Sequence, residues 1–347
     1  MDNKKNIKML TLDELITEIE GLGEKKFRAK QIYEWIHVKL VSSFDEMTDL
    51  SKGLREKLDQ NYWMTSAKII TVLESKVDGT KKFLLQFKDG EIVESVWMKY
   101  KHGNSVCVSS QIGCRMGCRF CASTLDGLDR SLSSAEMLEQ IYEITRQTGE
   151  RVSNVVVMGM GEPFDNYEDL IRFINMVTDK NGLNISQRNI TVSTCGIVPR
   201  IIDFANENLQ VTLALSLHAT TDEKRGALMP INNRYDIEEV LNACKYFYEK
   251  TGRRLTFEYG LVLGVNDTLE DARGLVELLK GMNCHVNLIP INPIKERDFL
   301  QSEEKQIKSF KNKLEKNNIN VTIRREMGRD IEGACGQLRR SKIKKEI

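Results

Sequence analysis

The chain lacks cysteine over its first third, because none of its eight cysteines lies before residue 107. It also has little proline, with five residues in total, and it contains no internal repeat, low-complexity tract or proline- and glycine-rich linker. Paired cysteines spread through a small secreted domain indicate a disulfide framework, and this distribution disfavours one. No apolar run approaches the roughly 20 residues of a membrane span, so we expect no membrane partner.

The chain also lacks an excess of either charge, since its 347 residues include 51 Lys and Arg and 50 Asp and Glu, for a net charge of +1. The overall charge does not attract the chain to nucleic acid, so a polyanionic partner would have to meet local basic patches. The composition, 41% hydrophobic and 29% charged, suits a soluble globular protein with one large domain and an appendage. Because the first residues, MDNKKNIKML, lack the apolar core of a signal peptide, we expect a cytoplasmic protein.

Three of the cysteines lie within eight residues, in the run CRMGCRFC that contains Cys114, Cys118 and Cys121. Soft sulfur ligands of this kind select zinc, copper(I) or iron–sulfur clusters. A structural zinc site needs four protein ligands, whereas this run offers three and no ligand pair follows at zinc-finger spacing. A cubane cluster bound by three cysteines keeps one iron open to a substrate or cofactor. Zinc and a set of inert buried thiols remain the alternatives to such a cluster.

The first hundred residues predict two small units. Helical spacing of apolar residues from about 11 to 63 indicates an N-terminal helical accessory domain over residues 1–66. Its basic residues either approach an RNA backbone or form a solvated helix face: Lys25, Lys26, Arg28 and Lys30. The runs KKFLLQF and EIVESVWM, joined by Lys88-Asp89-Gly90, predict a hairpin within a β connector over residues 67–101.

From residue 104 onwards, short apolar strand-like runs alternate with amphipathic helical stretches. The six strand-like runs are SVCVSS, VSNVVVMG, NITVST, VTLALSL, LTFEYGLVL and HVNLIPI. Six βα units predict an α/β fold with a partial (β/α)6 TIM-like barrel over residues 102–347. Active sites in such barrels lie at the C-terminal ends of the strands, so the residues that follow each strand are the candidates for chemistry.

Small and polar residues gather at these predicted strand ends. The cysteine run follows the first strand, and Gly159-Met160-Gly161-Glu162-Pro163 follows the second. Glycine allows close backbone approach to a ligand, and Glu162 before a rigid proline offers a fixed acceptor for an ammonium or hydroxyl group. Later strand ends supply Ser193, Ser216, Leu217, His218 and Asn292. Singly, each is an ordinary turn or capping residue, and only their convergence on one barrel mouth indicates a site.

The CxxxCxxC run, with an aromatic residue before its last cysteine, resembles the signature of the radical S-adenosylmethionine (SAM) superfamily, and GMGEP resembles its amino-group-binding turn. Longer stretches across nearly the whole chain resemble the RlmN/Cfr family of adenosine methyltransferases: CVSSQIGCRMGCRFCA, VSTCGIVPR, LALSLHA, RGALMPINNRY, NLIPINP, IEGACGQL and FRAKQIYEWI. The resemblance implies a [4Fe-4S] cluster on Cys114, Cys118 and Cys121 and two SAM molecules per turnover. The SAM contacts that it implies are Gly161, Glu162, Ser193, Ser216, Leu217, His218 and Asn292.

The same resemblance implies a catalytic cysteine pair. Cys335 would carry a methyl group taken from one SAM molecule, and a 5′-deoxyadenosyl radical made from another would remove a hydrogen atom from that methyl group. The resulting carbon radical would add to an adenine carbon whose hydrogen is too weakly acidic for ordinary base-promoted alkylation. Cys107 would then release the product by capturing the Cys335 sulfur in a disulfide. Because Cys335 lies outside any predicted regular element, we expect a mobile loop there.

Glu94 is the expected proton acceptor. Alternation along a strand over EIVESVWM places Glu94 on one face with Ile92, Val96 and Met98, where burial would raise the pKa of its carboxyl group. The resemblance assigns the same role, and the alternative is a plain ion pair with a nearby lysine. The remaining thiols match no role and are expected in the core: Cys195, Cys244 and Cys284.

The resemblance therefore implies an enzyme that methylates C2 of adenosine in 23S rRNA, at the peptidyl-transferase centre, and in tRNA, next to the anticodon. The rival is the C8-directed Cfr-type branch, whose members tend to lack the proline after the GE pair, so Pro163 favours C2. The alternative from another class is a non-catalytic RNA-binding protein with a structural metal site. The target base would have to be splayed out of its stack, and the candidate phosphate contacts are Lys99-Tyr100-Lys101-His102 and the C-terminal RRSKIKK. We expect a flavodoxin- or ferredoxin-type electron donor and a monomeric protein.

Overall fold

A ten-stranded sheet runs through the centre of the molecule in the computed structural model, which describes residues 4–339. Its middle part consists of parallel strands that follow one another in chain order: β6 (Gly103–Cys107), β9 (Val152–Val157), β10 (Ile190–Thr194), β11 (Thr212–Ser216), β12 (Leu255–Leu261) and β13 (Cys284–Pro290). They correspond to the six predicted runs. A further parallel strand, β14 (Asn320–Ile323), was not predicted. The described sheet is open, with β14 at one edge and β3 at the other, which confirms a partial barrel.

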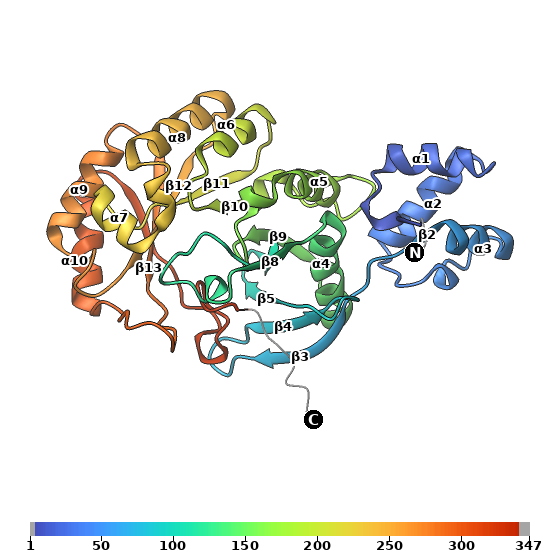
Figure 1. The fold of residues 1–347 in the computed structure, drawn as a ribbon, viewed down its shortest axis with the longest axis horizontal. Coiled ribbons are helices and arrows are strands. Elements are labelled where there is room, and N and C mark those ends of the chain that lie inside the picture. Colours follow the sequence, from blue (N-terminus) through green and yellow to red (C-terminus); the bar gives the residue numbers. More distant parts are fainter. Residues whose placement is uncertain (1–3, 340–347) are drawn as a thin grey trace.

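Helices cover the outer face of the parallel strands (Figure 1). They are α4 (Ser134–Thr148), α5 (Tyr167–Thr178), α6 (Val198–Asn206), α8 (Ile237–Thr251), α9 (Leu269–Leu279) and α10 (Glu304–Glu315). The short helix α7 (Asp222–Leu228) follows β11 and packs instead beside Cys118. Local sequence explains the bounds of α4, since Ser133 forms a capping box with Glu136 and Gly149 ends the helix at a φ of 67°. The apolar helix faces and the sheet share one hydrophobic core. Within residues 4–339, no helix has both the length and the apolar character to span a membrane.

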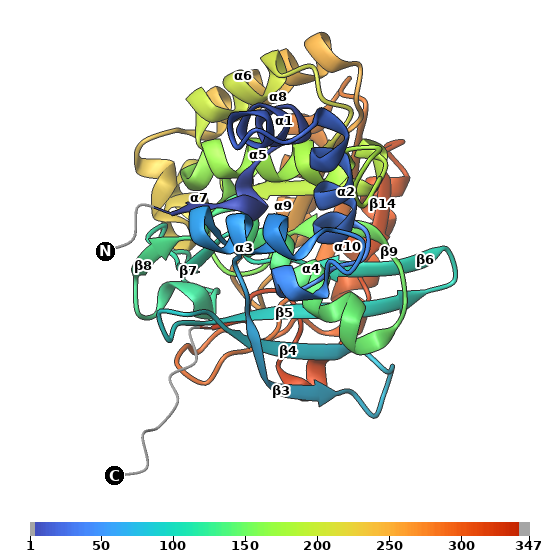
Figure 2. The ribbon, with the colours of Figure 1, turned by 90° about the vertical axis from the view of Figure 1, so that its right-hand side faces the viewer.

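The β connector continues the barrel sheet. It consists of β3 (Lys68–Glu74), β4 (Lys81–Gln86) and β5 (Ile92–Tyr100), paired antiparallel in that order. The predicted hairpin is confirmed, and Gly90 in its turn has a φ of 89°. β5 also pairs antiparallel with β6, so the connector lies beside the first barrel strand (Figure 2). Sequence alternation could not reveal this pairing, because β5 is buried on both faces from Ile92 to Met98.

The N-terminal residues form a helical unit with its own core. Its helices are α1 (Leu12–Gly21), α2 (Lys26–His37) and α3 (Lys52–Asn61), and a short parallel pair, β1 (Lys5–Asn6) and β2 (Tyr62–Trp63), joins its two ends. Thr11 begins α1 with a capping box to Glu14. The buried residues of the unit pack with one another rather than into the barrel core: Leu15, Ile19, Ile32, Ile36, Leu54 and Leu58.

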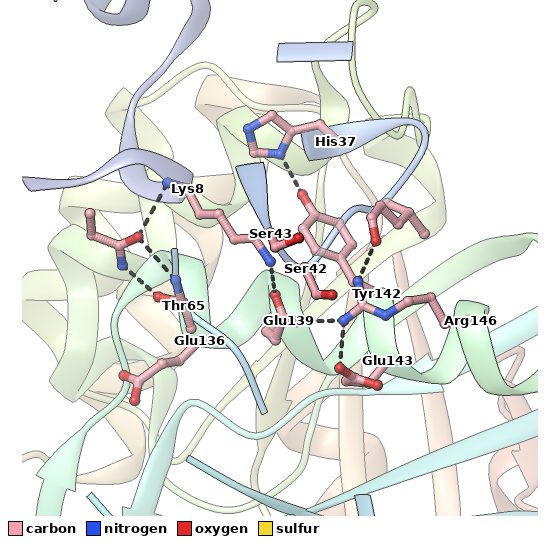
Figure 3. Close-up of polar contacts among 12 residues, drawn as sticks. Lys8, His37, Ser42, Ser43, Thr65, Glu136, Glu139, Tyr142, Glu143 and Arg146 are labelled. Carbon is pink, nitrogen blue, oxygen red and sulfur yellow. Dashed lines mark hydrogen bonds and ion pairs between the residues drawn. The ribbon is translucent and has the colours of Figure 1, made fainter. Parts of the chain in front are cut away.

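One face of α4 joins this helical unit to the barrel (Figure 3). Lys8 Nζ donates to Glu139 at 2.6 Å, and neither side chain is exposed. His37 Nδ1 lies 2.5 Å from the hydroxyl of Tyr142, and Arg146 donates to the Leu40 carbonyl. Burial lowers the pKa of Lys8, and the attraction of Glu139 opposes that shift. The helical unit is therefore fixed to α4 by buried polar contacts as well as by packing.

Replacing Glu139 with glutamine should destabilise the protein strongly. The change leaves the Lys8 ammonium buried without a carboxylate partner, which typically costs about 3–5 kcal/mol. Lys5→Met is the matched control, because it removes an exposed ion pair to Glu18, worth less than about 1 kcal/mol. Urea unfolding of the three proteins measures both losses. Equal stability of the Glu139→Gln and Lys5→Met variants would contradict a structural role for the buried pair.

Candidate active site

A cavity lies at the C-terminal ends of the parallel strands. Its wall contains most of the residues predicted from the strand ends, namely Cys114, Cys118, Cys121, Gly161, Glu162, Ser193, Ser216, His218 and Asn292, together with Cys335, which the family resemblance predicted. These residues come from segments far apart in the sequence, and the parallel sheet brings them together as expected for its topology. Three predicted site residues, Leu217, Cys107 and Glu94, do not line this cavity.

The three clustered cysteines lie on a loop whose base is closed by a two-stranded sheet. β7 (Gln111–Gly113) pairs antiparallel with β8 (Leu128–Ser131) on either side of the loop. Gly113 has a φ of 74°, and a Cβ atom there would lie 1.9 Å from the Gly127 carbonyl oxygen. The hydroxyl of Thr124 donates to the carbonyls of Cys118 and Cys121. The loop is therefore shaped by backbone constraints that a larger residue at position 113 would break.

The donor set of this loop fits an iron–sulfur cluster. Burial raises the pKa of all three thiols, to about 12 for Cys114, so they are neutral until a metal replaces the proton. Among residues 4–339, no three His, Cys, Asp or Glu side chains lie close enough to hold one metal ion. A cubane cluster places each thiolate on a different iron atom, so thiols that share one cavity wall without meeting at a point suit it.

Glu162 presents a buried carboxylate to the cavity. Its oxygens accept hydrogen bonds from the backbone N–H groups of Phe164, at 3.1 Å, and Cys195, at 2.8 Å. Burial raises the pKa of Glu162, and these hydrogen bonds oppose that shift. Gly161 has a φ of 96°, and a Cβ atom there would lie 2.5 Å from the Cβ of Gln111. The GMGEP turn thus holds the Glu162 carboxylate in a fixed position, as an acceptor for an ammonium group requires.

His218 and Asn292 offer defined hydrogen-bonding groups at later strand ends. His218 Nδ1 accepts from the Gly260 N–H at 2.7 Å, so the proton of the neutral ring lies on Nε2. Burial lowers the pKa of His218 to about 3, which keeps the ring neutral. Asn292 donates through Nδ2 to the Cys335 carbonyl at 3.1 Å, while its buried Oδ1 has no hydrogen-bond partner among the described residues. That oxygen is available to a bound donor.

The remaining strand-end residues differ in their position. Ser193 and Ser216 lie side by side, with 3.4 Å between their hydroxyl oxygens. Leu217 is fully buried in the hydrophobic core, and its backbone N–H donates to the carbonyl of Glu258. The hydroxyl pair is placed to meet a ligand, whereas a SAM contact by Leu217 stays a prediction.

A second cavity adjoins the first and contains Cys107. The two cavities share Met158, Ile289, Asn292, Arg324 and Cys335 in their walls, so the Cys335 residue borders both. Burial raises the pKa of the Cys107 thiol to about 12. All eight cysteines are free thiols, and none forms a structural disulfide. The structure thus brings Cys107 and Cys335 to the same cavity, and a transient bond between them stays a prediction.

The Cys335 loop is held to the rest of the molecule on both sides of the cysteine. The Gly336 carbonyl accepts from the Ala122 N–H at 2.8 Å, next to the cysteine run. Further back, Asp330 accepts from the hydroxyl of Ser75 at 2.6 Å. Movement of this loop between reaction steps would break some of these contacts, and its predicted mobility is untested.

Glu94 is buried and does not line either cavity. Its carboxylate lies 3.5 Å from Lys82 Nζ and accepts from the backbone N–H of Arg339 at 3.2 Å. The predicted burial is correct, since Glu94 is 2% exposed. The geometry also matches the alternative of a lysine ion pair, and the role of Glu94 as a proton acceptor stays a prediction.

Several buried polar residues near the site were not predicted from the sequence. Ser109 accepts from the Met160 N–H at 2.9 Å and donates to the Glu94 carbonyl at 2.7 Å. Gln140 on α4 bonds both the N–H and the carbonyl of Ser109. Arg324 borders both cavities and lies 3.5 Å from Glu258. No local pattern distinguishes these residues from ordinary polar ones, because their partners are distant in sequence.

Comparison with known proteins agrees with this geometry. Residues 108–279 match the radical SAM superfamily, and residues 5–63 match the ribosomal RNA large subunit methyltransferase N-terminal domain. A crystal structure of a radical SAM methyltransferase from Sphaerobacter thermophilus superposes with a TM-score of 0.92 at 42% identity, covering 96% of this chain and 99% of that one. The fold is therefore that of a radical SAM enzyme.

Two relatives identify the family within the radical SAM superfamily. A protein from Lachnospira eligens, named probable dual-specificity RNA methyltransferase RlmN, is 63% identical over 96% of this chain and 95% of its own length. A protein of the same name from Clostridium novyi is 54% identical over 98% of this chain and 99% of its own length. The chain belongs to the RlmN family of radical SAM RNA methyltransferases.

Proposed function

We propose that this protein methylates C2 of adenosine in 23S rRNA, at the peptidyl-transferase centre, and in tRNA, next to the anticodon. The observation that carries the proposal is the cavity wall, where the cysteine run, the GMGEP turn and Cys335 meet. The names of the relatives support the choice of two RNA classes. Pro163, which begins a short 3-10 helix directly after Glu162, supports C2 over C8.

The residues of the first cavity would hold both cofactors. Cys114, Cys118 and Cys121 would bind a [4Fe-4S] cluster, and the Glu162 carboxylate would accept from the amino group of SAM. Asn292, with its free Oδ1, and the Ser193–Ser216 pair would contact the rest of that molecule. When bound, the two cofactors supply a methyl group from a first SAM molecule and a carbon-centred radical from a second.

Cys335 and Cys107 would handle the methyl group. The Cys335 sulfur loses its proton and gains the methyl carbon, which later bonds to the adenine ring after losing one hydrogen atom. A proton acceptor, for which we propose Glu94, takes the hydrogen that leaves the ring as a proton. The Cys107 thiol then loses its proton and attacks the Cys335 sulfur, so a disulfide forms while the bond between that sulfur and the carbon breaks. The released carbon takes up a proton to complete the methyl group, and the one electron left over from the radical addition would return to the bound cluster. The shared cavity supports this pairing of thiols.

The accessory parts of the chain would contact the RNA. We propose that residues 1–66 form an RNA-binding domain, joined through residues 67–101 to the catalytic part over 102–347. The run Lys99-Tyr100-Lys101-His102 is a candidate phosphate contact, whereas the RRSKIKK run lies, beyond Arg339, outside the described residues. We also propose that the protein is a cytoplasmic monomer and that it receives electrons from a flavodoxin- or ferredoxin-type protein.

Deletion of the gene tests the proposal. Mass spectrometry of nucleosides from purified 23S rRNA and tRNA should show loss of 2-methyladenosine from both, and the intact gene should restore it. Loss from one RNA class alone would limit the substrate to that class. Unchanged 2-methyladenosine, or loss of 8-methyladenosine instead, would overturn the assignment.

A further inference from the structure

Arg225, on α7, is a fully buried arginine beside the cysteine site. Its side chain is 0% exposed. Nη2 donates to the Cys195 carbonyl at 2.7 Å and lies 3.4 Å from the Ser216 carbonyl, while Nη1 donates to Asn232 Oδ1 at 2.9 Å. The guanidinium group is thus surrounded by neutral acceptors.

A buried guanidinium group without a carboxylate partner is costly and needs another source of negative charge. Within residues 4–339, no carboxylate forms an ion pair with Arg225, and Asp222 reaches it only through Asn232. Burial lowers the pKa of Arg225, whereas the sulfurs of Cys195 and Cys118 and the Asp222 carboxylate oppose that shift. Arg225 Nη2 is bound to the carbonyl of Cys195, and Cys195 packs with Cys118, so the charge of Arg225 lies beside the cysteine site.

The fold makes room for this side chain. Gly196 has a φ of 105°, and a Cβ atom there would lie 3.1 Å from Arg225 Nη2 and 3.1 Å from a methyl group of Val240. A larger residue would have to displace one of these groups. The glycine of the VSTCGIVPR stretch is thus explained by the close approach of the guanidinium group.

One hydrogen-bond chain and one set of helix contacts connect Arg225 and its helix to the cavity. The Cys195 residue accepts from Arg225 through its carbonyl and donates to Glu162 through its N–H. At the C-terminal end of α7, Leu228 accepts from the Arg119 N–H, and Leu228 and Met229 pack against Cys118. The helix that carries Arg225 therefore contacts the cysteine loop, and its Arg225 side chain is linked to the Glu162 carboxylate through the backbone of Cys195.

We propose that Arg225 is a positioning residue that supplies a fixed, buried positive charge beside the cluster site and raises the reduction potential of the cluster. Thiolate ligands and each added electron make the site more negative, and a buried cation nearby stabilises that charge. The inference rests on one part of the proposed function, namely that Cys114, Cys118 and Cys121 bind a cluster. The electron in the test comes from a chemical donor, dithionite, which becomes oxidised as the cluster becomes reduced.

Arg225→Lys and Arg225→Gln separate charge from hydrogen bonding, because lysine keeps the charge and glutamine keeps an N–H donor. Each protein is purified without oxygen, loaded with iron and sulfide, and titrated with dithionite while the reduced cluster is followed by electron paramagnetic resonance. We expect the glutamine variant to have a lower midpoint potential. A tenfold lower ratio of reduced to oxidised cluster at a fixed potential corresponds to about 59 mV for one electron. The lysine variant should stay near the wild-type value.

Arg253→Gln is the matched control. Arg253 is partly buried and, like Arg225, has an Nε without a partner among the described residues, but it lies before β12 and donates to Thr212, at the opposite end of the strands. The Arg253→Gln variant should have the same midpoint potential of the cluster as the wild-type protein. Equal potentials for wild type and Arg225→Gln, or equal shifts for the lysine and glutamine variants, would overturn the proposal.

The role of Arg225 can still be tested if one variant does not fold. If the glutamine variant takes up no iron while the folded lysine variant does, the charge is required for assembly, which supports the proposal. If both are folded but take up no iron, the guanidinium shape rather than its charge matters, and the proposal is wrong. A wild-type protein that binds no cluster would instead contradict the proposed function, which is a separate outcome.

Discussion

Replacement of Cys335 with alanine should abolish methyl transfer to RNA while leaving the cofactor cavity in place. The sulfur is the atom that would carry the methyl group, whereas the contact that holds this residue runs from Asn292 Nδ2 to its backbone carbonyl and survives in alanine. The cavity walls would keep their other residues. Methylated adenosine should fall below detection in RNA incubated with the cluster-loaded variant, and 5′-deoxyadenosine should still form from SAM.

Cys284→Ala is the control for this result. Cys284 begins β13, at the end of the strand opposite the cavity, and lines neither cavity. Its removal should leave RNA methylation close to the wild-type level. Methylation by Cys335→Ala would show that another group carries the methyl, and loss of 5′-deoxyadenosine formation would show that Cys335 is needed for an earlier step.

Replacement of Cys118 with serine should remove the cluster and all activity that depends on it. A serine hydroxyl is a hard, weakly acidic ligand, and iron–sulfur clusters are held by thiolates. Cys118 also packs against Cys195, Leu228 and Met229, so serine would place an extra polar group in an apolar cluster. Iron and sulfide analysis of anaerobically purified protein should find little of either, and the visible absorption of the cluster should be absent.

Cys284→Ser tests whether the loss is specific to the cysteine run. It makes the same chemical change at a buried thiol at the opposite end of the strands from the cavity, so iron content should be retained. Full cluster content in Cys118→Ser would contradict the ligand assignment. Stoichiometric zinc in place of iron in the wild-type protein would favour the structural metal site that the sequence left open.

The location of the site could be predicted from the sequence because it follows from topology. Parallel strands end at one edge of a sheet, so residues after successive strands must converge. Glu162 and His218, which are separated by two intervening strands in the chain, line one cavity for this reason. These strands could be identified because short apolar runs alternate with amphipathic helical stretches along the chain.

Contacts between distant segments could not be predicted in this way. Lys8 and Glu139 are 131 residues apart, and nothing near either one marks them as a pair. Arg225 begins RGALMPINNRY, one of the stretches that resemble the family, but nothing in that stretch indicates its contact with the Cys195 carbonyl, 30 residues earlier. Glu94 shows the limit of strand alternation, which predicted that the side chain is buried but not that Lys82 faces it.

The most direct test of the central claim uses SAM with a fully deuterated methyl group. Cluster-loaded protein is incubated with dithionite and an RNA substrate, and the methylated adenosine is identified by mass spectrometry. The account predicts 2-methyladenosine that retains two of the three deuterium atoms, because one leaves while the methyl group is on Cys335. A product with all three would indicate transfer of an intact methyl group, and 8-methyladenosine would indicate the wrong ring carbon, so either result would contradict the account.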